Sequence, residues 1–175
     1  MSIRYAVPDD AKRVAEINVE GWQTAYREII PDEFLDSMDA KSRVERVKSA
    51  ISENPNTDLV FEDENQEVLG FCSFGELRWV EEFGEECDCE LYAIYVLSES
   101  RGKGVGKALL EATLAEFKGQ NKKGMLVNVL EGNTSSVNFY KNLGGVEIGR
   151  KPFVLNEIDY PQLTLAFRLS GNDES

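Results

Sequence analysis

The sequence contains no histidine and only three cysteines among its 175 residues. Without histidine the chain cannot build a Ser-His-Asp triad, a Cys-His pair or an HExxH zinc site. The cysteines, Cys72, Cys87 and Cys89, are too few for a disulfide framework, and the Cys-x-Cys pair lacks a third nearby thiol that would complete a metal site. We therefore expect no bound metal, and reduced thiols indicate a cytoplasmic protein.

Basic residues are also scarce, because 19 Lys and Arg stand against 32 Asp and Glu, for a net charge of −13. This balance repels a polyanion and argues against nucleic-acid binding. We expect no membrane partner, since no apolar run approaches the roughly 18 residues of a membrane span and no apolar signal segment follows Met1. Hydrophobic residues still make up 42% of the chain, enough for a core. The length predicts a single domain over residues 1–175, with residues 170–175 as a frayed tail.

Hydrophobic spacing along the chain predicts one mixed α/β domain. The strand at residues 87–97 is apolar on both faces, so we expect it in the middle of the sheet. An acidic loop is expected over residues 81–86. The other expected strands are residues 3–7, 58–62, 67–77, 125–130, 146–155 and 158–169. A first helix is expected to open at residues 8–10 and to be broken at residues 30–32, and the other expected helices are residues 39–52, 104–118 and 133–142.

A glycine-rich segment joins the central strand to the helix expected at residues 104–118. Backbone N–H groups at a helix start are unpaired and the helix dipole is positive there, and glycine lets an anion approach closely, so this geometry suits a phosphate group. Residues 101–123 hold six basic and two acidic residues, a local excess of positive charge. The alternative is a glycine-rich turn with solvated lysines.

Two common phosphate-binding patterns do not match this segment. Ala108 stands where a Walker A loop has the hydroxyl that holds magnesium, and Arg101 stands where that loop has its first glycine. Leu109 stands where a dinucleotide fingerprint beginning at Gly104 requires glycine or alanine. The segment therefore predicts a different phosphate ligand.

The pattern Arg101-x-x-Gly104-x-Gly106 between a long strand and a helix resembles the GNAT family of acetyl-CoA-dependent N-acetyltransferases. Residues 91–96 lie upstream at the family's distance, and residues 133–144 resemble its Asn-x(6)-Tyr-x-x-Leu-Gly segment. The resemblance is close over about residues 87–149. It implies an acetyltransferase domain with the GNAT fold: a mixed, mostly antiparallel sheet of about seven strands with a splayed parallel pair, flanked by about four helices.

The resemblance implies acetyl-CoA as the cofactor and assigns residues to it. The backbone of Ile94, Tyr95 and Val96 would pair with the pantetheine amides in the gap between the splayed strands. Asn133, a polar residue at a helix start, would contact the pantetheine arm, together with Ser136 and Tyr140. The pyrophosphate would be cradled by the turn that comprises Arg101, Gly102, Lys103, Gly104, Val105, Gly106 and Lys107.

The same resemblance makes Tyr140 the general acid that protonates the departing thiolate, and the alternative is an ordinary core aromatic. The base is assigned to Glu90 or to ordered water, because Asn128 stands where other members carry a glutamate. The alternative for Glu90 is a solvated member of the acidic run 85–90. Gly145 replaces a frequent phenylalanine, which we expect to loosen the wall beside Tyr140.

By analogy Trp22 and Tyr26 would line the acceptor pocket, with Tyr92 and Asn128 as further substrate contacts. The alternative for Trp22 and Tyr26 is a core-facing helical stripe. The implied reaction moves an acetyl group to a primary amine by direct attack in a ternary complex, with a small cationic amine favoured as acceptor by the acidic balance. Alternatives are a peptide N-terminus or lysine as acceptor, or a non-catalytic acyl-CoA-binding module. We also expect a homodimer.

Overall fold

The computed structural model describes residues 1–170, which form two compact units. The first unit comprises Met1–Phe74 and Ala93–Thr113, and the second comprises Gly75–Tyr92 and the chain from Leu114 onward. Strands β3 (Val68–Glu76) and β4 (Cys89–Val96) and helix α5 (Val105–Gly119) contribute residues to both units. The single-domain assignment stays a prediction, and the predicted frayed tail lies outside the described residues except for Ser170.

Within residues 1–170, seven strands form a mixed sheet in the order β1-β2-β3-β4-β5-β9-β6. β4 and β5 are parallel, whereas β1 with β2, β2 with β3, β5 with β9 and β6 with β9 pair antiparallel. This confirms the predicted fold class. The remaining strands of the sheet are β1 (Ser2–Tyr5), β2 (Asp58–Glu62), β5 (Gly124–Leu130), β6 (Val146–Arg150) and β9 (Gln162–Arg168).

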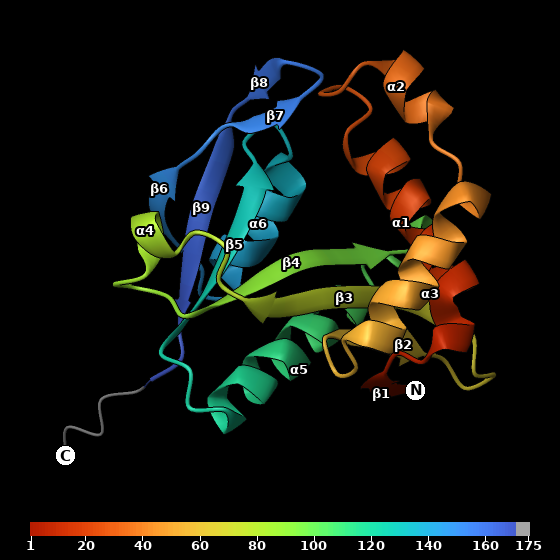
Figure 1. The fold of residues 1–175 in the computed structure, drawn as a ribbon, viewed down its shortest axis with the longest axis horizontal. Coiled ribbons are helices and arrows are strands. Elements are labelled where there is room, and N and C mark those ends of the chain that lie inside the picture. Colours follow the sequence, from red (N-terminus) through yellow and green to blue (C-terminus); the bar gives the residue numbers. More distant parts are fainter. Residues whose placement is uncertain (171–175) are drawn as a thin grey trace. The chain divides into compact units, whose positions relative to one another are not determined.

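In the first unit, helices α1 (Ala11–Ala25) and α3 (Val44–Glu53) lie side by side (Figure 1). A short 3₁₀ turn, Pro8–Asp10, precedes α1, and proline suits this position because its missing N–H would be unpaired anyway. Asp10 also accepts a hydrogen bond from the Val7 N–H at 2.8 Å. The apolar stripe of α1 is buried against the strands, and the resulting core includes Ala6, Val14, Ile17, Ile51, Val60, Val68, Phe71 and Leu97.

In the second unit, helix α6 (Thr134–Asn142) packs against β5 and β9 (Figure 1). Most β5 side chains are buried, as expected of a strand covered on both faces. A smaller apolar cluster comprises Leu77, Cys87 and Leu126, with Trp79 and Phe83 packed against it. These contacts support the strands and helix that carry the candidate residues of this unit.

The two predicted closing strands, 146–155 and 158–169, are wrong, because the chain forms four shorter strands there. β6 ends before Pro152, and β8 (Ile158–Tyr160) ends before Pro161; proline has no N–H to donate to a ladder. β7 (Phe153–Leu155) pairs with β8 as a separate hairpin. Its two turn residues, Asn156 and Glu157, have φ of 50° and 63°, which are the positive values of a type I′ turn.

Two short helices were not predicted. α2 (Asp32–Ser37) follows Pro31 and begins with two acidic residues that favour a helix N-terminus. α4 (Val80–Phe83) occupies the beginning of the predicted acidic loop over residues 81–86. The helix expected over residues 39–52 is a 3₁₀ turn followed by α3, which begins at Val44. Helices this short depend on tertiary packing, so their local sequence signal is weak.

Candidate functional site

The glycine turn is the part of the first unit best suited to a phosphate. Gly102 and Gly104 have φ of 73° and 84°, in the left-handed region that favours glycine. Apart from each glycine itself and its two neighbours in the chain, no atom lies within 4 Å of the position a Cβ would take, so the backbone is open to a ligand. α5 begins at Val105, and the first N–H groups of a helix have no partner within it. Together with the exposed Lys103 and Lys107, this arrangement fits the pyrophosphate of acetyl-CoA.

The end of β4 offers backbone groups at an open edge of the first unit. The Leu97 N–H donates to the Leu69 carbonyl of β3 at 2.9 Å. Because peptide groups alternate along a strand, those of Tyr95 also point to β3, whereas those of Ile94 and Val96 point the other way. Over the described residues, the register of β4 with β5 covers Cys89↔Met125 to Leu91↔Val127. Alternation therefore favours Ile94 and Val96 over Tyr95 as partners for a ligand's amides.

An aromatic cluster joins α1 to β4 in the first unit. The rings of Trp22 and Tyr26 meet edge to face at 5.0 Å between centroids, and Phe34 of α2 lies 6.4 Å from Trp22. The hydroxyls of Tyr26 and Tyr95 are 3.3 Å apart. Tyr95 packs on Gly21, where a Cβ would lie 2.3 Å from its ring. The structure thus brings Trp22 and Tyr26 together with Tyr95, and burial raises the pKa of Tyr26, which keeps the phenol neutral.

Glu90 in the second unit is fully buried, with an exposed fraction of 0%. Its carboxylate accepts hydrogen bonds from the Arg78 backbone N–H at 3.0 Å, from Nε at 3.2 Å and from Nη2 at 2.7 Å. The guanidinium also lies 4.4 Å from the centre of the Tyr92 ring, and the Tyr92 hydroxyl donates to the Glu76 carbonyl at 2.6 Å. Glu90 is therefore not the solvated surface charge considered as the alternative.

The electrostatics of this group follow from these contacts. Hydrogen bonding to Glu90 raises the pKa of Arg78, so the guanidinium stays charged. Burial, followed by the charge of Glu90, raises the pKa of Tyr92, so its phenol stays neutral. The Arg78 side chain is 58% exposed, which leaves a cation with a fixed orientation within reach of solvent or ligand.

The side chains of Asn128 and Asn133 each accept a hydrogen bond within the second unit. The Asn128 carbonyl oxygen accepts a 2.6 Å hydrogen bond from the buried Thr164 hydroxyl, which fixes its side chain on β5. Asn133 is the N-cap of α6, and its side chain accepts from the Ser136 N–H at 3.3 Å. This pair is the N-cap geometry that the sequence indicated.

Tyr140 lies on α6 with only 7% of its surface exposed. Its ring contacts Phe139 and Phe167 edge to face, at 5.1 and 6.4 Å between centroids. A Cβ at Gly145 would lie 2.9 Å from the Tyr140 carbonyl oxygen and 3.2 Å from the Phe167 ring. The expected loosening of the wall is therefore wrong, because Phe167 fills the space that a larger residue at position 145 would take.

The chemistry of the remaining groups narrows the choice of base. The three cysteines are free and buried; burial raises the pKa of Cys72 to about 12 and that of Cys87 to about 11, and it also raises that of Cys89. Neutral thiols do not accept protons from an amine.

Within residues 1–170 no group of three or more Cys, Asp or Glu is placed to hold a metal, and no helix is long and apolar enough to cross a membrane.

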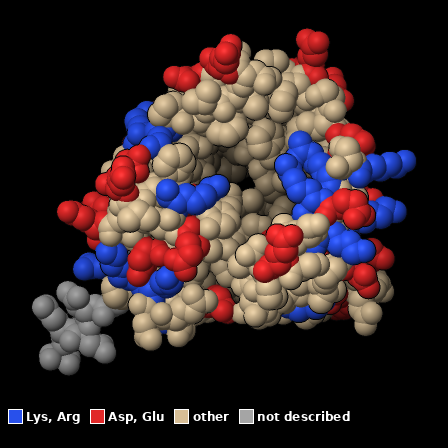
Figure 2. Space-filling view, in the orientation of Figure 1, with Lys and Arg blue, Asp and Glu red and all other residues tan. Residues whose placement is uncertain are grey.

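Sequence reasoning missed Arg78, which organises the surroundings of Glu90 and Tyr92. A signal for it existed, since Arg78 is the only Lys or Arg between Lys48 and Arg101. A lone cation among acidic residues is a candidate partner for a buried carboxylate. On the face drawn in Figure 2, basic and acidic side chains are interspersed, so the net charge alone does not reveal such a pair.

The mixed sheet with its parallel β4–β5 pair, the open glycine turn before α5 and the capped helix α6 are the elements that the resemblance to acetyl-CoA-dependent N-acetyltransferases led us to expect. A family model described as "Acetyltransferase (GNAT) family" matches residues 14–144, and the chain belongs to this family.

Similar proteins are named as acetyltransferases and acyltransferases. The chain is 39% identical over 142 residues to the uncharacterized N-acetyltransferase YuaI of Bacillus subtilis, covering 81% of this chain and 78% of that one. It is 27% identical over 155 residues to the L-amino acid N-acyltransferase MnaT of Escherichia coli, covering 88% and 84%. The solved structure of yncA from Salmonella typhimurium with its cofactor acetyl-CoA has the same fold, with a TM-score of 0.71, 23% identity and coverage of 100% and 97%.

Proposed function

We propose that this enzyme transfers the acetyl group of acetyl-CoA to a primary amine of a small molecule by direct attack in a ternary complex. The observation that carries the proposal is the open glycine turn between β4 and α5. Its backbone N–H groups would hold the pyrophosphate, and the open edge of β4 would pair with the pantetheine amides. When bound, acetyl-CoA supplies a thioester whose carbonyl carbon an amine can attack. Asn133 and Ser136 are proposed as further contacts of the pantetheine arm.

Tyr140 is proposed as the general acid. A phenol ordinarily titrates near pH 10, so it holds its proton at neutral pH and can donate it to a sulfur that becomes a thiolate. The Phe139 and Phe167 rings pack edge to face against the Tyr140 ring, which is 7% exposed. A positioned donor of this kind accelerates the step in which the thiolate departs.

The acceptor amine must lose a proton before or during attack, and Glu90 or ordered water is proposed to take it. Arg78 donates three hydrogen bonds to the Glu90 carboxylate. These contacts take three of the roughly four lone-pair sites of the carboxylate, so Glu90 can act as a base through the remaining site on Oε1, and otherwise Glu90 serves to orient Arg78.

A small cationic amine is the first candidate for the acceptor. The net charge of −13 attracts cations, and the rings of Trp22, Tyr26 and Phe34 form an aromatic group of the kind that binds ammonium ions. The second candidate is the α-amine of an amino acid. It is favoured by the oriented, 58% exposed guanidinium of Arg78, which can bind a carboxylate, and by the name of the relative MnaT.

A panel of acceptors distinguishes these candidates by the rate at which CoA thiol is released. We expect turnover with diamines or polyamines, or with neutral L-amino acids, and only background hydrolysis with peptides that carry a free N-terminus or a lysine. An Arg78→Met variant should lose amino-acid activity selectively if Arg78 binds the carboxylate. Turnover with peptides alone would contradict the small-molecule acceptor.

Binding of acetyl-CoA tests the site itself. Isothermal calorimetry in the presence of EDTA should show a complex with the wild-type protein. Gly104→Val should weaken it roughly tenfold or more, because a β-branched residue at φ of 84° is strained by about 1–3 kcal/mol and covers the backbone. Gly119→Ala is the matched control, since Gly119 also faces open space but has no positive φ. No binding to wild type at millimolar acetyl-CoA would refute the proposal.

A homodimer and a cytoplasmic location remain predictions that follow from the sequence. If calorimetry shows acetyl-CoA binding but no amine supports CoA release, the chain is a non-catalytic acyl-CoA-binding module, which was the alternative from a different class.

A further inference from the structure

The segment that connects β4 to the glycine turn is bound at both ends by side chains of α1. At its beginning the Ser98 backbone N–H donates to Oε1 of Glu20 at 2.8 Å. At its end Nη2 of Arg101 donates to Oγ1 of Thr24 at 2.7 Å. Glu20 and Thr24 are four residues apart on a helix, so they lie on one face. One face of α1 therefore holds the chain on the way into the turn.

The Thr24 hydroxyl is itself oriented for this contact. It donates to the Glu20 backbone carbonyl at 2.8 Å, which leaves its lone pairs free to accept from Arg101. Nε of Arg101 also donates to the Val96 carbonyl at 3.4 Å, at the end of β4. The guanidinium thus bridges α1 and β4. The arginine that the family pattern associates with the cofactor is bound here to protein groups.

The position of α1, which carries Glu20 and Thr24, is fixed by its close packing on β4. The Tyr95 ring fills the space where Gly21 lacks a side chain, and its hydroxyl lies 3.3 Å from that of Tyr26. Gly21 lies between Glu20 and Thr24 on the same helix. The helix position is therefore fixed by contacts that do not involve the turn.

We propose that Glu20 and Thr24 are positioning residues for the cofactor-binding turn, and that Arg101 positions the turn rather than binding a phosphate. This rests on the proposed function, because it takes the turn as the pyrophosphate site. Backbone N–H groups bind an anion tightly only when they are held in place beforehand. Gly102 and Gly104 give the chain many alternative conformations, and the contacts at Ser98 and Arg101 restrict them.

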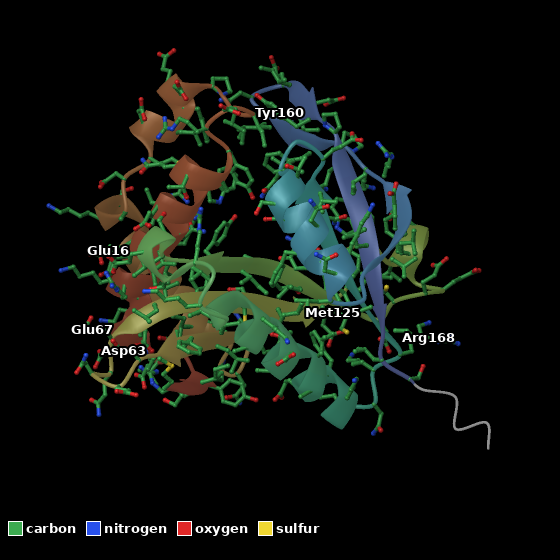
Figure 3. All side chains as sticks on the ribbon, turned by 180° about the vertical axis from the view of Figure 1, so that it is seen from behind. Glu16, Asp63, Glu67, Met125, Tyr160 and Arg168 are labelled. Carbon is green, nitrogen blue, oxygen red and sulfur yellow. The ribbon has the colours of Figure 1, made fainter. Side chains whose placement is uncertain are left out.

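Paired variants at the two positions test this proposal. Thr24→Val and Glu20→Met keep the size of each side chain and remove the hydrogen-bond acceptor, whereas Thr24→Ser and Glu20→Gln keep an acceptor. We expect the first pair to raise KM for acetyl-CoA roughly tenfold with kcat unchanged, and the second pair to stay near wild type. Glu16→Met, at a position on α1 labelled in Figure 3, is the control for a change on the same helix.

An inhibitor that lacks phosphate shows whether a higher KM for acetyl-CoA comes from a displaced pyrophosphate-binding turn or from a general loss of structure. Pantetheine lacks the pyrophosphate, so its inhibition constant against acetyl-CoA should be the same in wild type, Thr24→Val and Glu20→Met. Equal weakening of pantetheine and acetyl-CoA, or an unchanged KM for acetyl-CoA in both variants, would overturn the proposal. Calorimetry on wild type keeps the two proposals apart: absence of acetyl-CoA binding there refutes the proposed function, whereas binding that both variants retain in full refutes only the positioning role.

Discussion

Tyr140→Phe should lower kcat by about 10²-fold or more, while KM for acetyl-CoA stays near its wild-type value. The substitution keeps the ring that packs against Phe139 and Phe167 and removes only the hydroxyl. If that hydroxyl donates the proton to the leaving sulfur, the loss is confined to the chemical step. Steady-state kinetics with acetyl-CoA varied at saturating acceptor measures both constants.

The control for this prediction is Tyr160→Phe. Tyr160, labelled in Figure 3, lies on β8 in the separate hairpin, where its ring is 6.5 Å from Phe153. This variant should leave kcat unchanged. If Tyr140→Phe also retains the wild-type kcat, Tyr140 is the core aromatic that its 7% exposure equally fits, and water protonates the thiolate.

Long, strongly patterned elements could be predicted from the sequence. The bounds of β2, residues 58–62, agree with the prediction, and β4 and α5 are shifted by a few residues at most. The apolar spacing of α5 indicates a helix, and β2 and β4 are short apolar runs with β-branched and aromatic residues, which favour strands. The prediction of the two closing strands was wrong because alternating residues continue across the points where the strands end. Pro152 and Pro161 marked both of these points in the sequence.

The candidate site could be predicted only where chemistry is carried by the backbone or by a motif. The glycine turn and the Asn133 cap were found because their geometry needs particular residues at fixed spacing. Arg78 was missed because its importance comes from Glu90, which is twelve positions away in the chain and becomes its partner only in the folded protein. Glu20 and Thr24 were missed for the same reason, since nothing local marks them as partners of Ser98 and Arg101.

Arg78→Met should lower the free energy of unfolding by about 3 kcal/mol, because it leaves the Glu90 carboxylate buried without its cation. This is the lower end of the range for broken buried pairs, since the Arg78 side chain is 58% exposed and its removal admits water. For a chain of this length the melting temperature should fall by roughly 6–12 °C. Urea unfolding of wild type and variant measures the difference.

We expect Arg78→Met to lose stability because the buried Glu90 carboxylate is left unpaired, and not because an arginine as such is removed. Arg150 is the matched control, because its side chain is also 58% exposed, but its partners Glu131 and Glu147 are 43% and 35% exposed. Arg150→Met should leave stability close to wild type, since exposed carboxylates remain hydrated. Adding Glu90→Gln to Arg78→Met removes the unpaired charge and should restore most of the lost stability. Equal losses for Arg78→Met and Arg150→Met would contradict the argument.

The single variant Glu90→Gln then separates the two roles proposed for Glu90. The amide keeps an oxygen that can accept from Arg78, but it cannot take a proton from an amine. If Glu90 is the base, kcat/KM should fall by about 10²-fold at neutral pH and partly recover at alkaline pH, where more of the acceptor is already the free amine. A pH–rate profile that keeps the wild-type shape at every pH would mean that water takes the proton. In that case the Glu90 carboxylate acts only by orienting Arg78. The Glu90→Gln variant should then show a higher KM for the acceptors of the panel that carry a carboxylate.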